Sequence, residues 1–292
     1  MRRCVDGRRC AYALLLPAAA VQILNAQSPA HIPADASAQN SPAALPETSV
    51  ETTIPAKYYH GFGGGFVLYD MNARTYTRFR AAECRKRLTP ASTFKILNSL
   101  IGLESGVIRD EHFVIRWDSV HRSTEAWNRD HDLASAIENS VVWYYQELAR
   151  RVGRKRMTAY IDSTGYGNND ASGPIDRFWL GSTLRISADE QVGFLRRLYA
   201  EDLPFSHRSI EIVKRILILQ RTDSTVLHAK TGMATDMSGV AVGWFVGYVE
   251  KAGDVYFFAL TMTSPDEERD GETIFRERKG TALAILKELG IQ

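Results

Sequence analysis

The stretch TPASTFKILNSL, residues 89–100, places a serine and a lysine three positions apart in a largely apolar run. Residues three apart on a helix share one face, so Ser92 and Lys95 are predicted to be neighbours. Burial among hydrophobes disfavours the charged form of a lysine and lowers its pKa. A neutral amine beside a serine can accept the hydroxyl proton or can itself be modified, and either route activates the serine as a nucleophile.

The ordinary alternative is a surface lysine on a core helix, because Ser-x-x-Lys is a loose pattern. Two observations favour chemistry. This is the only Ser-x-x-Lys in the chain, and lysine is rarely buried without a functional or ionic reason.

Three further short motifs could contribute polar groups to the same site. Ser140 begins Ser-Val-Val where a helical pattern breaks, Tyr-Gly-Asn occupies 166–168, and Lys-Thr-Gly at 230–232 ends a strand-like stretch. A serine at a helical break could relay a proton or could be a cap. A lysine at a strand end can offer positive charge to a ligand, and a glycine lets backbone approach closely. Taken singly, each could equally be a cap, a turn or an exposed strand end.

The elements that must position these residues follow a simple order. GFVLYD predicts an early strand, residues 90–205 are mostly helical, and three β-rich stretches follow residue 222 before a C-terminal amphipathic helix. Thr89 and Pro90 suit the cap and first position of the Ser92 helix, and Gly106 suits its end. The expected fold class is therefore α+β: an antiparallel sheet built from both chain ends and flanked by terminal helices, with an inserted, mainly helical lobe.

These elements predict one domain at 56–292, with a sheet lobe at about 56–89 and 210–292 and a helical lobe at about 90–209. Residues 27–55 are rich in Ala, Ser and Pro and predict a flexible leader. Residues 1–26 combine basic and apolar segments typical of a secretory signal, with cleavage near Ala26. The expected location is secreted, in the periplasm. Cleavage would leave Cys84 as the one cysteine, so no internal disulfide is expected.

Composition excludes several classes of partner. The 36 Lys and Arg residues nearly balance 34 Asp and Glu, so neither nucleic acid nor a stable membrane partner is expected. The seven histidines show no His-Glu-x-x-His spacing, and Arg-Asp-His-Asp at 129–132 is better explained as a polar loop. No metal is expected.

In their order along the chain, the four motifs resemble those of the class D (oxacillinase-type) serine β-lactamases. The resemblance runs from about residue 60 to the end and includes the strings PASTFKI, NSVVWYYQELAR, FWLGSTLRIS, and KTG followed by GWFVGYVEK. It implies hydrolysis of small-molecule β-lactams such as penicillins through a serine acyl-enzyme. The alternatives are a β-lactam-sensing receptor domain, which acylates without turnover, and a cell-wall D,D-peptidase or transpeptidase, which usually has Ser-x-Asn where this chain has Ser140-Val-Val.

The resemblance also implies catalytic roles. Ser92 would be the nucleophile, and Lys95, carboxylated reversibly by CO₂ or bicarbonate, the general base. Trp179 would donate its indole N–H to that carbamate, and Val142 and Leu180 would pack around it. Ser140 would carry a proton to the leaving nitrogen.

Substrate binding is implied for the last motif and the C-terminal helix. Lys230 completes the catalytic set, and Thr231 and Gly232 would line the strand beside the substrate. The backbone N–H groups of Met233 and Ser92 would form the oxyanion hole. Arg278 is the expected anchor for the substrate carboxylate, with Arg276 as the alternative. With Tyr166 at this position of Tyr-Gly-Asn, the resemblance further implies inhibition by chloride.

Overall fold

The computed structural model describes residues 47–292, which belong to one compact unit, Leu45–Gln292. The predicted signal and residues 27–46 of the predicted leader lie outside the described residues. Seven strands form one sheet: β1 Thr48–Glu51, β2 Phe66–Asp70, β3 Thr75–Phe79, β4 Ile218–Arg221, β5 Thr225–Thr235, β6 Ala241–Lys251 and β7 Asp254–Ser264.

Eight α-helices accompany the sheet within these residues: α1 Ala81–Arg85, α2 Lys95–Glu104, α3 Leu133–Glu138, α4 Val142–Val152, α5 Arg154–Thr164, α6 Ala188–Tyr199, α7 His207–Ile216 and α8 Glu267–Glu288. Three 3₁₀ turns, η1 Ile54–Tyr58, η2 Ala91–Phe94 and η3 Glu125–Trp127, complete the set. In the described part of the chain, no helix is both long and apolar enough to cross a membrane.

The sheet joins the two ends of the domain, as the sequence predicts. Its strand order is β1-β3-β2-β7-β6-β5-β4, and the early strand β2 pairs antiparallel with the late strand β7, Phe66 opposite Leu260. All neighbouring pairs are antiparallel except β1 with β3. The α+β class is thus confirmed. The parallel edge strand β1 lies inside the predicted leader, so ordered structure begins earlier than residue 56.

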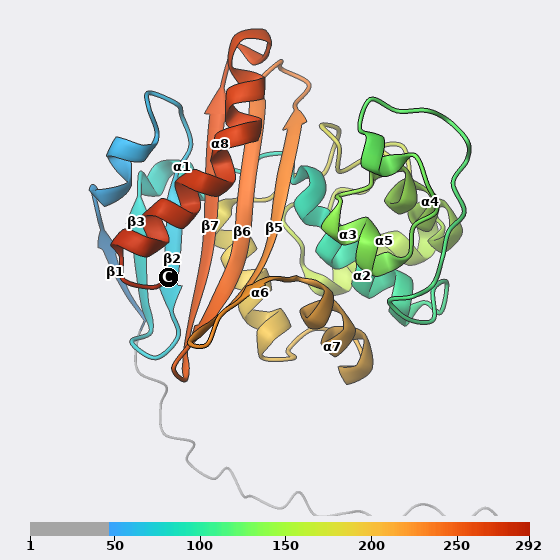
Figure 1. Cartoon of the computed structure of the whole chain (residues 1–292), viewed down its shortest axis with the longest axis horizontal. Helices are drawn as coiled ribbons and strands as arrows, with labels where there is room; N and C mark the ends of the chain where they lie inside the picture. The colour runs from blue at the N-terminus through green and yellow to red at the C-terminus, as the bar shows by residue number, and fades with distance from the viewer. Residues whose placement is uncertain (1–46) are drawn as a thin grey trace, which may run out of the picture. The chain divides into compact units, whose positions relative to one another are not determined.

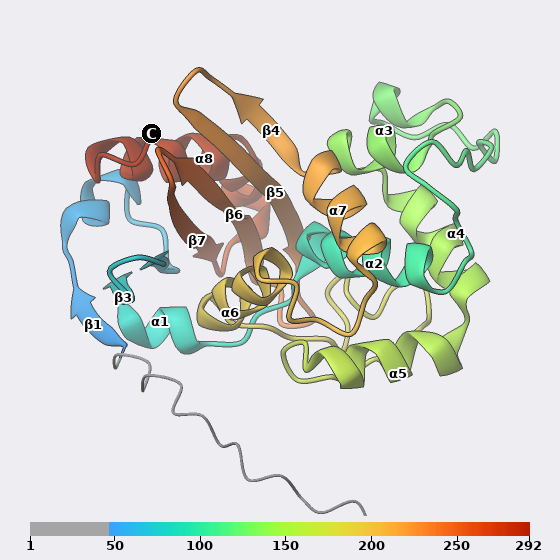
Figure 2. The same ribbon diagram turned by 90° about the horizontal axis from the view of Figure 1, so that it is seen from below.

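The sheet is covered on both faces (Figure 1). Helix α8 packs on β6 and β7 from one side, whereas α6 packs on β2, β6 and β7 from the other, as Figure 2 shows. The side chains of β6 alternate between the two faces accordingly. Trp244 and Val246 belong to one apolar cluster, whereas Phe245 and Val249 belong to the cluster on the other face. Helix α6 lies within the predicted helical lobe, at about 90–209, but its apolar face packs on the sheet.

The helical lobe is built around α2. Helices α4 and α7 pack on α2, α5 packs on α4, and α3 contacts α7. Every residue from Lys95 to Leu103 is buried, which confirms that the lysine lies in a core helix. Because α7 packs with these helices, the lobe extends beyond residue 209 to the end of α7.

Candidate active site

Ser92, Lys95 and Ser140 meet at the start of α2. Lys95 Nζ lies 3.0 Å from Ser92 Oγ and 3.0 Å from Ser140 Oγ, and it donates to the Ser140 carbonyl at 2.5 Å. The predicted proximity of the serine and the lysine is therefore present, and the third residue, 45 positions later in the chain, completes the triangle. Each oxygen lies within proton-transfer distance of the amine.

The Lys95 side chain is completely buried. Desolvation, reinforced by the nearby charge of Lys230, holds the pKa of the Lys95 amine well below its usual value. Among the described residues no carboxylate forms an ion pair with it. The lowered pKa favours the neutral amine, which is the state a proton acceptor requires.

A second lysine approaches the same serine from the sheet. Lys230 Nζ, on β5, lies 3.0 Å from Ser140 Oγ. Burial, with the nearby charge of Arg278, lowers the pKa of Lys230 to about 7. Ser140 Oγ thus bridges two amines, and their mutual repulsion disfavours two protonated lysines at once.

The turn before α2 is held by distant parts of the chain. Ala91 has a left-handed φ of +50°, and its N–H donates to the Trp179 carbonyl at 3.0 Å. Thr89 is not the helix cap that the sequence predicts. Its hydroxyl donates to the same carbonyl and accepts from the Gly181 N–H, while Ser92 lies in the 3₁₀ turn η2. A left-handed backbone conformation at an alanine costs about 1–3 kcal/mol of conformational free energy. The hydrogen bonds to the Trp179–Gly181 segment keep the turn in this conformation.

Gly232 allows β5 to pass close to this turn. A Cβ at position 232 would lie 3.1 Å from the Pro90 carbonyl oxygen and 3.2 Å from Thr93 Cγ2. A larger residue would push the strand away from Ser92. The glycine of Lys-Thr-Gly thus sets the spacing between nucleophile and strand.

Ser140 sits at the break between α3 and α4, as predicted, with a left-handed φ of +53°. Two indoles brace this junction. Trp127 Nε1 donates to the Asn139 carbonyl at 2.9 Å, and Trp143 Nε1 donates to the Trp127 carbonyl at 2.8 Å. The serine is therefore positioned by the loop that carries η3 as well as by its own helices.

Trp179 is buried against Phe94 and Phe178. Its Nε1 is buried and has no hydrogen-bond partner among residues 47–292. An unsatisfied buried donor is costly and calls for an acceptor. Of the two apolar residues predicted beside Lys95, Val142 lines the cleft with Ser92, whereas Leu180 is half-buried in the helical core and is absent from the cleft wall.

Arg278 and Arg276 differ in burial and in whether they reach the cleft. Arg278 is 6% exposed and lines the cleft, and burial lowers the pKa of its guanidinium to about 10. Arg276 points to solvent and pairs with Glu272 on the same helix. Of the two predicted anchors, only Arg278 reaches the site.

The cleft has a volume of about 360 Å³. Predicted residues in its wall are Ser92, Ser140, Val142, Thr231, Gly232, Met233 and Arg278. Five others were not predicted: Thr124, Trp127, Glu138, Asn139 and Phe275. Glu138 and Asn139 directly precede the Ser-Val-Val motif, so extending that motif would have found them. Trp127 and Thr124 lie on a loop with no motif of its own.

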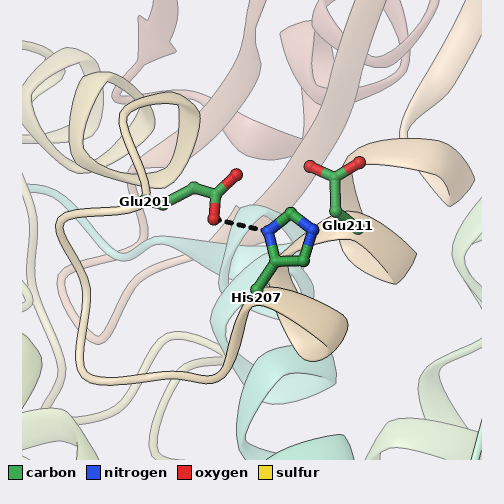
Figure 3. Close-up of side chains that lie close together, drawn as sticks. All are labelled: Glu201, His207 and Glu211. Atoms are coloured by element: carbon green, nitrogen blue, oxygen red, sulfur yellow. Dashed lines mark hydrogen bonds and ion pairs between the residues drawn. The ribbon is translucent and has the colours of Figure 1, made fainter.

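A second cluster of titratable groups consists of Glu201, His207 and Glu211 (Figure 3), whose ligand atoms all lie within 4.8 Å of one another. It is largely exposed. His207 Nδ1 bonds Glu201 at 2.7 Å, and Lys214 pairs with Glu201 at 3.2 Å and Glu211 at 3.0 Å. Lys214 already supplies a cation there, so the geometry gives no reason to add a metal.

Comparison with known proteins agrees with this geometry. Residues 46–278 match the family model of the penicillin binding protein transpeptidase domain. Beta-lactamase OXA-48 of Klebsiella pneumoniae is 43% identical over 209 residues, covering 72% of this chain and 78% of that protein. Regulatory protein BlaR1 of Bacillus licheniformis is 37% identical over 249 residues, covering 85% of this chain but 40% of BlaR1.

A solved structure agrees with these matches. The class D β-lactamase YbXI from Nostoc superposes with a TM-score of 0.74 at 40% identity, covering 80% of this chain and 95% of that one. The chain therefore belongs to the penicillin-binding protein transpeptidase-domain family and, within it, to the class D serine β-lactamases. It is a serine hydrolase of that class.

Proposed function

We propose that the protein hydrolyses β-lactams in two steps. Ser92 Oγ attacks the ring carbonyl, the carbonyl–nitrogen bond breaks, and the nitrogen leaves with a proton. Water then attacks the resulting ester, which releases the opened acid and restores the serine. The names of the relatives OXA-48 and YbXI support this substrate class.

The observation that carries the proposal is the amine of Lys95. It lies 3.0 Å from Ser92 Oγ, is fully buried, and has a strongly lowered pKa. A buried amine whose neutral form is favoured, in contact with the hydroxyl, meets the requirement for a base that activates the serine.

Lys95 is further proposed to be N-carboxylated by CO₂. Only a neutral amine adds to CO₂, and the addition releases one proton. A carbamate at this position would supply an anionic general base for both steps. Two features of the chain support an anion here: the unsatisfied Nε1 of Trp179, whose ring packs on Phe94 next to Lys95 in the sequence, and the nearby charge of Lys230. An indole is a donor only, so it matches an anionic oxygen.

The remaining residues are proposed to act in the roles that the family resemblance implies. Ser140 Oγ, between Lys95 and Lys230, passes a proton to the departing nitrogen. Arg278 and Thr231, which also line the cleft, bind the substrate carboxylate. Backbone N–H groups of Ser92 and Met233 stabilise the carbonyl oxygen as it becomes negative.

Turnover of a chromogenic cephalosporin by the purified protein tests the first proposal. Repeated turnover per enzyme supports hydrolysis. Stoichiometric acylation without release would favour a β-lactam-sensing domain, and the relative BlaR1 is named a regulatory protein. Cleavage of a D-Ala-D-Ala peptide without cephalosporin turnover would favour a cell-wall peptidase.

The carbamate is tested by adding and removing bicarbonate. Because only the neutral amine reacts with CO₂, activity should fall at mildly acidic pH, since acid favours the protonated amine, and bicarbonate should restore it. The Lys95→Ala variant should not respond to bicarbonate. Equal activity with and without CO₂, together with normal deacylation by Lys95→Ala, contradicts the modification.

Export to the periplasm is proposed from residues 1–26 alone, whose basic and apolar parts are typical of a cleaved signal. Mass spectrometry of the N-terminus, after fractionation of cells expressing the full chain, should detect a form that begins near Gln27. Recovery of the intact chain from the cytoplasm would contradict export.

A further inference from the structure

Phe275 is a large apolar side chain that the fold leaves in the open. It belongs to α8 and is 57% exposed, yet it lines the catalytic cleft together with Arg278. Other bulky apolar residues of α8, such as Ile274 and Ile285, are completely buried beneath the sheet. Burial therefore does not explain an aromatic residue at position 275.

Its ring contacts the guanidinium of the proposed carboxylate anchor. Arg278 Cζ lies 4.3 Å from the centroid of the Phe275 ring. The negative face of an aromatic ring attracts a guanidinium, and a flat stack holds the fork in one plane.

Arg278 has few other restraints. Its Nε has no hydrogen-bond partner within residues 47–292, and no carboxylate of the described chain forms an ion pair with it. The nearby Lys230 repels it, as the lowered pKa of Lys230 reflects. On the sheet side it passes Gly243, where a Cβ would lie 3.3 Å from Arg278 Cδ. The sheet thus confines the stem, whereas the head has the ring as its partner.

We propose that Phe275 is a positioning residue that holds the Arg278 guanidinium in the plane that receives the substrate carboxylate. The proposal rests on the function proposed above. Phe275 acts through Arg278, so it should matter only for ligands that carry a carboxylate. It therefore tunes selectivity for acids and leaves the chemistry at Ser92 unaffected.

The test uses two probes that both require Ser92. A chromogenic cephalosporin carries the carboxylate, and phenylboronic acid, which bonds to the serine as an inhibitor, has none. Phe275→Leu keeps an apolar side chain but removes the ring, whereas Phe275→Tyr keeps the ring face. Arg276→Gln is the matched control on the same helix, since Arg276 points away from the cleft.

Phe275→Leu should raise the cephalosporin KM about three- to thirtyfold with kcat nearly unchanged, because the lost contact is made equally in ground and transition states. Phe275→Tyr and Arg276→Gln should keep the wild-type KM. The inhibition constant of phenylboronic acid should be the same for all four proteins.

Two outcomes overturn the proposal: an unchanged KM in Phe275→Leu, or a parallel loss of boronic acid binding, which indicates general damage to the cleft. A wild-type protein that binds the boronic acid but never turns over the cephalosporin refutes the proposed function instead. The two failures are thereby distinguished.

Discussion

The molecule holds two clusters of titratable side chains with opposite electrostatic character. At the active site, Lys95, Lys230 and Arg278 are buried basic residues, and no carboxylate within residues 47–292 forms an ion pair with them. In the second cluster, Glu201 and His207 are exposed, and each charge has a partner (Figure 3). The pKa of His207 is raised by Glu201, whereas all three cleft pKa values are lowered.

The difference shows that a concentration of ionisable groups does not by itself mark a reactive site. Charges that are paired and exposed to water are already well solvated, so they contribute little to stability and gain little from a further ligand. Buried basic groups without counterions can be stabilised by an anion that binds beside them. The active site is therefore suited to stabilise negative charge on a substrate carboxylate, on a developing oxyanion and on the proposed carbamate.

The largest difference between the two clusters should appear in catalysis, when one hydroxyl is removed from the cleft. Ser92→Ala should abolish acylation and lower the turnover of a chromogenic cephalosporin by several orders of magnitude. His207→Ala, in the other cluster, should retain wild-type turnover. Mass spectrometry after incubation with penicillin should detect the acyl adduct in His207→Ala only. An adduct on Ser92→Ala would mean that another residue is the nucleophile.

Trp179→Phe should produce the next largest effect. It preserves the ring packing against Phe94 and removes the unsatisfied N–H. Hydrogen bonds to charged groups contribute about 1.5–3 kcal/mol, so turnover should fall roughly tenfold to a hundredfold. Bicarbonate should recover part of that loss if the indole stabilises a carbamate. A fully active Trp179→Phe would show that the orphaned donor has no role.

Two histidines extend the comparison to stability. Burial lowers the pKa of His131, so the unfolded chain takes up the proton first, and stability should fall as pH drops below about 6.5. His207 has the opposite sign: its raised pKa favours the folded protein at low pH, and that gain disappears as pH rises through the folded pKa. Thermal melts across this range should show a shallower acid loss in His131→Gln and a slightly steeper one in His207→Gln. Matching slopes in all three proteins would refute both assignments.

The smallest effect is expected when a metal ion is added to the cluster of Glu201, His207 and Glu211. Lys214 already neutralises Glu201 and Glu211, so added zinc should leave the melting temperature unchanged. Glu201→Gln should also melt like the wild-type protein. A zinc-dependent rise in the melting temperature that Glu201→Gln eliminates would establish a metal site there.

Local spacing predicted the reactive centre well. Ser92 and Lys95 are adjacent because both occupy the start of one buried helix, and the Ser140 break and the Lys230 strand end also have local signals. The strands β2, β5, β6 and β7 and the capping box of α6, Ser187 with Glu190, were equally readable.

The errors arose where distant contacts override local preference. Thr89 resembles a cap, but its hydroxyl is bonded to the Trp179–Gly181 segment, ninety positions later. The amphipathic pattern of α6 shows that it has an apolar face but not which layer that face meets. Trp127 reaches the cleft by bonding the Asn139 carbonyl, an interaction without any spacing rule.

The pairing of β2 with β7 also dictates when this site can come into being during synthesis. Phe66 on β2 cannot pair until Leu260 on β7 has been synthesised, and Arg278 follows later still in the chain. The nascent chain therefore emerges with its nucleophile helix but without the strand, the anchor or half of the sheet. Closing so long a loop is slow. The active site therefore cannot be complete until the last helix, α8, has been made.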